Sequence, residues 1–136
     1  MSVSKDNRTD QPAILELLEK WARSVRAKDF NGILVNHSPD ILMFDLPGPL
    51  ESRGIEAYRK TWDLFFPWSD DPVIFDFDEM NVEAGDDVAY VTALMRCTGT
   101  EKSGERVSLK FRLTVGLRKV DGQWIVKHEH HSIPAS

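Results

Sequence analysis

The sequence predicts an α+β domain in which three N-terminal helices pack on a strongly curved, mainly antiparallel sheet. In the first half of the chain apolar residues recur at helical spacing, whereas from Pro72 onward they alternate with polar residues at the period of a β-strand. Helices gathered on one face of an antiparallel sheet define the α+β class. A bent sheet under helices leaves a cone-shaped interior, and we expect a small-molecule pocket there.

A first helix is predicted from about Pro12, after a polar N-terminal segment, residues 1–10, that we expect to be flexible. Asp10 is a suitable N-cap, and Pro12 fits the first turn of a helix. The remaining residues, 11–136, are expected to form a single domain. The apolar face of this helix has members three and four residues apart: Ile14, Leu17, Leu18, Trp21, Ala22 and Val25.

Two more helices and a short strand are predicted before Pro72. A short helix is expected from about Phe30 to near His37, and the turn signal at residues 38–40 follows it. Residues 41–46 indicate a strand that stops at the Pro-Gly-Pro sequence of residues 47–49. A third helix after Gly54 carries an aromatic-rich face and ends at Pro67; that face holds Tyr58, Trp62, Phe65 and Phe66.

Four antiparallel strands joined by hairpins are predicted for the second half, at about residues 72–84, 88–100, 105–120 and 123–132. The Asp-Gly pair at residues 121–122 is a strong hairpin signal. In the first of these strands Met80 and Val82 fall on the opposite parity from Phe75 and Phe77. This change of parity predicts a β-bulge or bend.

Composition limits the function classes. The chain has 136 residues, the size of one domain, and needs no disulfide to bury a core. Seventeen Lys and Arg against 22 Asp and Glu give a net charge of −5, which disfavours nucleic acid and anionic membranes as partners. The single cysteine, Cys97, fits a reducing compartment, and no apolar run reaches the length of about 18–20 residues that spans a membrane. We therefore expect a cytoplasmic protein with no membrane partner.

Four stretches of the sequence are typical of a known superfamily. They are AKDFNG at residues 27–32, HSPDILMFD at 37–45, RGIEAY at 53–58 and the ending DGQWIVKHEHHSIP at 121–134. With the predicted element order, they make residues 12–134 resemble the nuclear-transport-factor-2-like superfamily, and in particular its SnoaL-like branch. The superfamily includes ketosteroid isomerases, polyketide cyclases and plain binding modules. The resemblance thus implies the fold and a pocket, but no single reaction.

The resemblance to ketosteroid isomerases implies a role for Asp45. It falls where those enzymes carry the base aspartate, before the Pro-Gly turn. The position of their oxyanion tyrosine falls on Trp21, whose indole N–H can donate a hydrogen bond, and their protonated aspartate falls near Thr114 or Val115. The resemblance therefore implies the base without the complete oxyanion hole.

Asp45, His128 and His130 are the candidate catalytic residues. Asp45 lies in an otherwise apolar segment, where it either faces the pocket, caps the following turn or pairs with an arginine. His128 and His130 alternate on the face that carries Trp124, so either could act as an acid or hydrogen-bond donor beside Asp45; the alternative is a packed histidine at the sheet end. His131 is expected to face the other way and to be exposed. Two histidines lack a third ligand for a metal, so we predict no metal and no cofactor.

Further residues are expected to line the pocket, although aromatic residues at helical spacing can equally be plain core, and an arginine on a strand can lie on the outer face of the sheet. The predicted ligand-binding residues are Trp21, Tyr58, Trp62, Phe66, Met95, Arg112 and Trp124.

The leading functional hypothesis is a cofactor-independent isomerase, cyclase or dehydratase that uses an Asp/His pair on an apolar, cyclic substrate. The alternative is a non-catalytic ligand-binding or dimerisation module of the same fold. The outer face of a long sheet in a small domain needs cover, and we expect a homodimer through that face.

Overall fold

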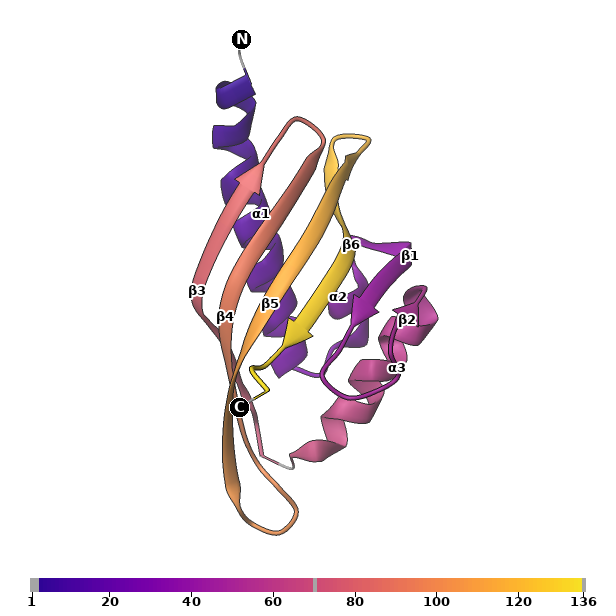
Figure 1. Ribbon diagram of the computed structural model, residues 1–136, viewed down its shortest axis with the longest axis vertical. Coiled ribbons are helices and arrows are strands. Elements are labelled where there is room, and N and C mark those ends of the chain that lie inside the picture. Colours follow the sequence, from indigo (N-terminus) through magenta and orange to yellow (C-terminus); the bar gives the residue numbers. More distant parts are fainter. Residues whose placement is uncertain (1–2, 70, 136) are drawn as a thin grey trace.

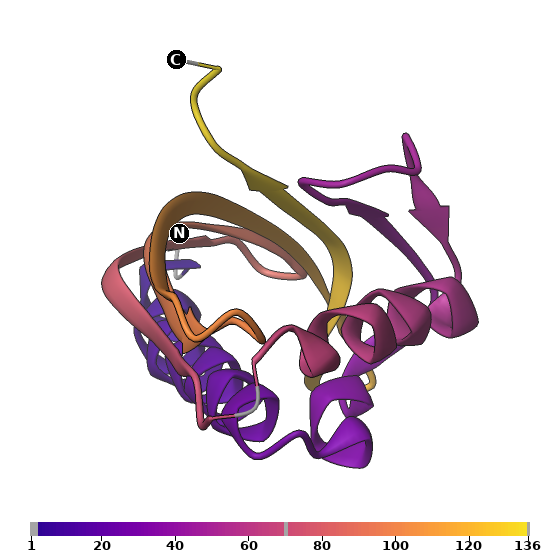
Figure 2. The ribbon, with the colours of Figure 1, turned by 90° about the horizontal axis from the view of Figure 1, so that it is seen from below.

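A six-stranded sheet forms the frame of the protein, and the helices lie against its concave face (Figures 1 and 2). The computed structural model describes residues 3–69 and 71–135, with side chains from Asp10 onward. The elements in chain order are α1 (Val3–Arg26), α2 (Phe30–Leu34), β1 (His37–Phe44), β2 (Ser52–Arg53), α3 (Ile55–Phe65), the 3₁₀ helix η1 (Phe66–Trp68), β3 (Ile74–Ala84), β4 (Val88–Thr100), β5 (Arg106–Val120) and β6 (Gln123–Ser132).

The strand order is β2-β1-β6-β5-β4-β3, and every neighbouring pair is antiparallel except β1 and β6, which run parallel. The predicted α+β class is confirmed, with a mixed sheet. Of the α-helices in the described residues, only α1 and α2 precede the first strand, because α3 follows the β1–β2 hairpin. Figure 2 shows the sheet curling around α1, with α2 and α3 beside it. No helix of the described chain is long and apolar enough to cross a membrane.

Helix α1 begins earlier than predicted. It starts at Val3, so Pro12 lies inside the helix and Asp10 is not an N-cap. The Asp10 carboxylate instead accepts hydrogen bonds from Lys119 Nζ at 3.0 Å and from Trp124 Nε1 at 3.1 Å. These contacts tie the turn of α1 around Asp10 to the β5–β6 hairpin. Met1 and Ser2 of the segment predicted to be flexible lie outside the described residues.

The predicted irregularity in β3 is confirmed. Phe77 pairs with Met95 of β4, and Glu79 pairs with the next residue of β4, Leu94, so Asp78 is an extra residue. An extra residue reverses which side chains face inward beyond it. This bulge explains why the apolar residues of β3 change parity in the sequence.

A second bulge, in β6, was not predicted. Val126 pairs with Leu117 of β5, whereas His128 pairs with Gly116, which leaves Lys127 as the extra residue. Trp124 and Val126 are buried ahead of the bulge, and beyond it the buried residues are Glu129 and His131.

The prediction that His128 and His130 share the inner face with Trp124 is therefore wrong. His130 is exposed and His128 only half-buried, because the bulge turns both onto the outer face of the sheet. The prediction of an exposed His131 is wrong for the same reason: its side chain is buried on the inner face.

Candidate active site

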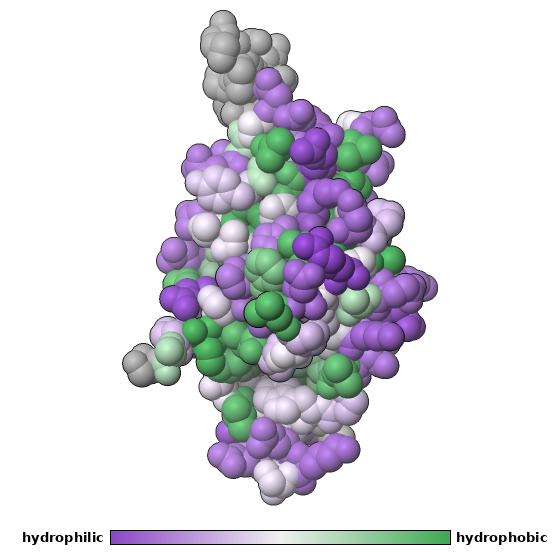
Figure 3. Space-filling view, turned by 45° about the vertical axis from the view of Figure 1, so that its right-hand side comes forward, coloured by the Kyte–Doolittle hydropathy of each residue, from purple (hydrophilic) through white to green (hydrophobic). Residues whose placement is uncertain are grey.

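A cavity of about 640 Å³ lies between α3, η1, the loop from β1 to β2 and the inner face of β3, β4 and β5. Its walls are mainly hydrophobic, and six large side chains contribute to them: Trp62, Phe65, Trp68, Phe75, Leu109 and Phe111. Its rim is formed in part by the β1–β2 loop and α3, which expose Leu46, Leu50 and Leu64 to solvent. Figure 3 shows hydrophobic side chains gathered in the lower half of this side of the molecule. Such a hollow suits a small, largely apolar ligand.

Among the described residues, three ionisable groups line this aromatic cavity besides the thiol of Cys97: Asp45, Lys60 and His131. Asp45 lies just past the end of β1, half-buried, and its Oδ1 accepts a hydrogen bond from the backbone N–H of Leu46 at 2.8 Å. It therefore both lines the cavity and braces the turn that follows. Lys60 is exposed on α3. Burial raises the pKa of the Cys97 thiol to about 11, so it stays protonated at neutral pH.

His131 is the buried imidazole of the cavity wall. Its ring stacks on Phe111, with centroids 5.5 Å apart and planes 10° apart. It also packs edge-to-face with Trp62, with ring centroids 6.5 Å apart. Its Nε2 lies 3.2 Å from Oε1 of Glu129. Nδ1 of the same ring has no hydrogen-bond partner among the described side chains and backbone. The ring is thus packed between Phe111 and Trp62 and held by Glu129, with Nδ1 unpaired in the described structure.

Glu129 lies at the centre of a buried polar cluster that joins four elements. Its Oε2 accepts a hydrogen bond from the Tyr58 hydroxyl of α3 at 2.7 Å and lies 3.1 Å from His37 Nε2 at the start of β1. Trp21 of α1 donates its indole N–H to the Tyr58 oxygen at 3.0 Å. All of these side chains are buried, so the cluster forms part of the core.

The cluster fixes two protonation states. Burial by itself would raise the pKa of Glu129, but hydrogen bonds from His131 and His37, and the charges that these two residues carry when protonated, lower it to about 2. Burial, followed by the charge and hydrogen bond of Glu129, raises the pKa of Tyr58 well above its usual value. At neutral pH Glu129 is therefore a carboxylate that only accepts, and Tyr58 is a neutral donor.

Several residues predicted to bind a ligand lie elsewhere. Trp62 lines the cavity, but Trp21 and Tyr58 are not among its lining residues and are buried in the Glu129 cluster. Phe66 packs against Trp62 and Phe30, outside the lining residues.

Three further residues predicted to contact a ligand are not among those that line this cavity. Met95 is fully buried in the core but does not line the cavity. Trp124 lies where the β5–β6 hairpin contacts Asp10. Arg112 is exposed on the outer face, where its Nε donates to Ser132 Oγ at 3.1 Å, because its parity on β5 points it away from the helices.

The sequence interpretation missed Glu129 and His37, and it misplaced His131. The signal in the sequence is the acidic residue set among histidines in the segment KHEHHS, residues 127–132. An acid and a histidine two residues apart on one strand face can pair, but only the bulge at Lys127 decides which face that is.

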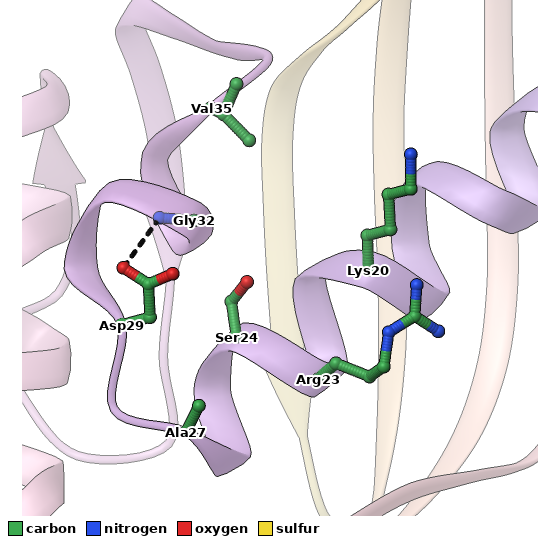
Figure 4. A pocket seen from close by; sticks show the side chains of 7 residues that line it. All are labelled: Lys20, Arg23, Ser24, Ala27, Asp29, Gly32 and Val35. Atoms are coloured by element: carbon green, nitrogen blue, oxygen red, sulfur yellow. Dashed lines mark hydrogen bonds between the residues drawn. The ribbon is translucent and has the colours of Figure 1, made fainter.

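Other candidate sites are weaker. Within residues 3–69 and 71–135, no three His, Cys, Asp or Glu side chains are grouped so that they could hold a metal ion. A second hollow of about 390 Å³ lies between α1 and α2. In Figure 4 the Asp29 carboxylate turns toward the Gly32 N–H, which it caps, whereas Lys20 and Arg23 extend away from it. Its polar groups therefore do not converge on one point.

Comparison with known proteins agrees with this architecture. A family model described as a SnoaL-like domain matches residues 14–136, and no curated protein matches the chain significantly. A solved NTF2-like protein of unknown function from Pseudomonas putida KT2440 is 32% identical, with a TM-score of 0.85; the match covers 95% of this chain and 89% of that one.

Two more distant structures share the fold. A candidate dehydratase of the NTF2-like family from Streptomyces avermitilis is 15% identical, with a TM-score of 0.82 and coverage of 95% of this chain and 99% of that one. The association domain of C. elegans CaMKII is 19% identical, with a TM-score of 0.73 and coverage of 93% and 97%. One fold thus carries proteins with quite different descriptions.

Proposed function

Because this chain belongs to the SnoaL-like domain family, we propose that it is a cofactor-independent acid–base enzyme of the isomerase, cyclase or dehydratase type. Its substrate is an apolar, cyclic compound bound in the cavity between α3 and the sheet. The observation that carries the proposal is a buried histidine, His131, which lines an aromatic cavity and is hydrogen-bonded to the ionised carboxylate of Glu129. The description of a distant neighbour as a candidate dehydratase is compatible with this class of chemistry.

The Glu129–His131 pair supports the role of His131 as a base. An ionised carboxylate accepts only, so the 3.2 Å contact makes Nε2 of His131 the donor and leaves the lone pair of a neutral ring on Nδ1. When Nδ1 takes a proton from an acidic C–H or O–H of the substrate, the Glu129 carboxylate stabilises the imidazolium. The same nitrogen then returns the proton to a different atom in an isomerisation, or to a leaving hydroxyl in a dehydration.

Asp45 supplies the second acid–base group. Its Oδ1 is held by the Leu46 N–H, and the carboxylate lines the same cavity as His131. A substrate bound in the cavity would meet both a base, His131, and a carboxyl group, Asp45. This assignment keeps the predicted role of Asp45 and moves the imidazole partner from His128 and His130 to His131.

The aromatic walls define the substrate class. Flat rings pack well against Trp62, Phe65 and Phe111 through stacked and edge contacts. We therefore expect a carbocyclic or aromatic compound that carries a carbonyl or hydroxyl group, with an acidic proton next to it.

Isotope exchange tests the proposal without knowledge of the natural substrate. Wild-type protein should accelerate deuterium uptake at the carbon next to the carbonyl in one or more members of a panel of apolar cyclic ketones dissolved in D₂O, as measured by mass spectrometry. Leu109→Trp, which fills the cavity, should abolish the acceleration, whereas Val88→Trp on the outer face should retain it. Ketones that raise the melting temperature of the wild type but never exchange would instead favour the non-catalytic binding module.

We further propose that the chain forms a homodimer through the outer face of the sheet. Val88, Tyr90 and Leu94 of β4 are roughly half exposed there, which is unfavourable for large apolar side chains on one strand. The neighbours described as association domains make such an assembly compatible with the fold.

Sedimentation equilibrium tests the dimer. Wild type should sediment as a dimer at micromolar concentration, and Leu94→Glu should sediment as a monomer because it places a charge in the interface. Leu64→Glu is the control, since Leu64 is even more exposed to solvent than Leu94 but lies on α3, and it should remain dimeric. A monomeric wild type contradicts this proposal.

A further inference from the structure

We infer that His37 is a buried imidazolium ion paired with Glu129, and that this pair is a positioning device that keeps His131 neutral, with Nδ1 free to act as a base. The inference deepens the proposed function, on which its catalytic part rests. His37 lies at the first position of β1, and its side chain is 1% exposed.

Both ring nitrogens of His37 face atoms that can only accept. Nδ1 lies 2.9 Å from the carbonyl oxygen of Val35, and Nε2 lies 3.1 Å from Oε2 of Glu129. A carbonyl and a carboxylate have no proton to give, so each nitrogen must carry its own. A histidine with two N–H groups is positively charged.

The nearby phenol does not offer a neutral alternative. The Tyr58 oxygen lies 3.3 Å from Nε2 of His37, but only 2.7 Å from Oε2 of Glu129. The hydroxyl of Tyr58 donates its single proton to the closer, charged oxygen of Glu129. The Tyr58 oxygen already accepts a hydrogen bond from Trp21 Nε1. A neutral His37 with a bare Nε2 would therefore point a lone pair at a carboxylate and at a phenol oxygen, with no donor between them.

A protonated His37 balances the charge of the cluster. The titratable groups in contact with Glu129 are His37 from β1, Tyr58 from α3 and His131 from β6, and α1 contributes only the neutral Trp21. Among the described residues no hydrogen bond links this cluster to another charged side chain. The positive charge of His37 neutralises the negative charge of Glu129, so the buried carboxylate is neutralised without a proton on Nδ1 of His131.

The consequence for the cavity is direct. If His37 carried no charge, His131 would be the sole counter-charge available to the buried carboxylate. Glu129 would then draw a proton onto the His131 ring, and Nδ1 would lose the lone pair that a base requires. His37 thus acts on the cavity through Glu129 without contacting it.

Nitrogen-15 NMR of the histidine side chains tests the inference on the intact protein. In wild type at neutral pH, both ring nitrogens of His37 should carry protons, and His131 should carry one only, on Nε2. His37→Gln removes the charge, and the ratio of protonated to neutral His131 at the same pH should rise roughly tenfold or more. His128→Gln makes the same substitution on the outer face and should leave that ratio unchanged.

Two results would overturn the inference. One is a wild-type spectrum in which Nε2 of His37 is unprotonated, a measurement that needs no variant to fold. The other is a folded His37→Gln protein in which the protonation of His131 is unchanged. Neither readout uses a substrate, so the two proposals can fail separately. If the spectra are as expected but no ketone exchanges deuterium, the enzyme proposal is refuted and the ion pair stands. If ketones exchange deuterium but the spectra are contrary, the ion pair is refuted and the enzyme proposal stands.

Discussion

Replacing Glu129 with glutamine should lower the free energy of unfolding by about 3–5 kcal/mol, the cost of removing one partner from a buried ion pair. The glutamine has nearly the same shape, so packing changes little. Its amide cannot neutralise a protonated His37, and its NH₂ group would face donors from Tyr58, His37 or His131. Urea denaturation followed by tryptophan fluorescence and circular dichroism measures the loss.

Glu83→Gln is the matched control, because Glu83 is exposed on β3 and no hydrogen bond of the described structure involves its side chain. Its stability should stay within about 0.5 kcal/mol of wild type. A Glu129→Gln protein that is as stable as this control would show that the cluster contributes nothing to the folded state.

Acid titration of wild type provides an independent readout of the same group. The folded pKa of Glu129, about 2, lies below its usual value of 4.5. The contribution of a carboxyl group with a lowered pKa is complete above the usual value and disappears as the pH falls through the folded one. Wild type should therefore lose stability between these two pH values more steeply than Glu129→Gln does.

His131→Gln should slow ketone deuterium exchange by a factor of about 10²–10⁴, the typical contribution of a positioned general base. Glutamine can still donate to Glu129, but it offers no basic nitrogen to the cavity. The rate of deuterium uptake at saturating ketone measures the loss, and the melting temperature shows whether the variant is folded.

His130→Gln makes the same change one residue away, on the outer face, and should retain the wild-type rate. Asp45→Asn should also slow exchange, because Asp45 is the second acid–base group in the cavity. Equal rates in wild type, His131→Gln and Asp45→Asn would contradict the acid–base proposal.

Most of the fold could be predicted from the sequence because its signals are local. The helical spacing of Ile14, Leu18 and Trp21, and the alternation along residues 105–120, correspond to α1 and β5. The bulge in β3 was also predictable, since its apolar residues change parity on either side of Asp78. The pairing of β1 with β6 was not, because parallel contact between distant segments leaves no local pattern.

The candidate site was predicted only in part, for a related reason. Asp45 follows an apolar strand and precedes a Pro-Gly turn, so its place at the cavity could be expected from its neighbours. In β6, histidines are compatible with either face, so no change of hydrophobic parity marks the bulge at Lys127. The contact between His37 and Glu129 joins residues 92 positions apart, and only the folded chain brings them together.

The extra residue at Lys127 decides which side chains of β6 face the cavity. If the same residues ran in regular alternation past Val126, two imidazoles, His128 and His130, would project beneath the helices, and the acid between them would lie on the outside. Flattening the bulge without changing the sequence would therefore exchange the whole set of reactive groups, whereas deleting Lys127 would remove the bulge and keep Glu129 and His131 inside. Proteins built on this frame could diverge in chemistry by gaining or losing a bulge, without any substitution in the cavity.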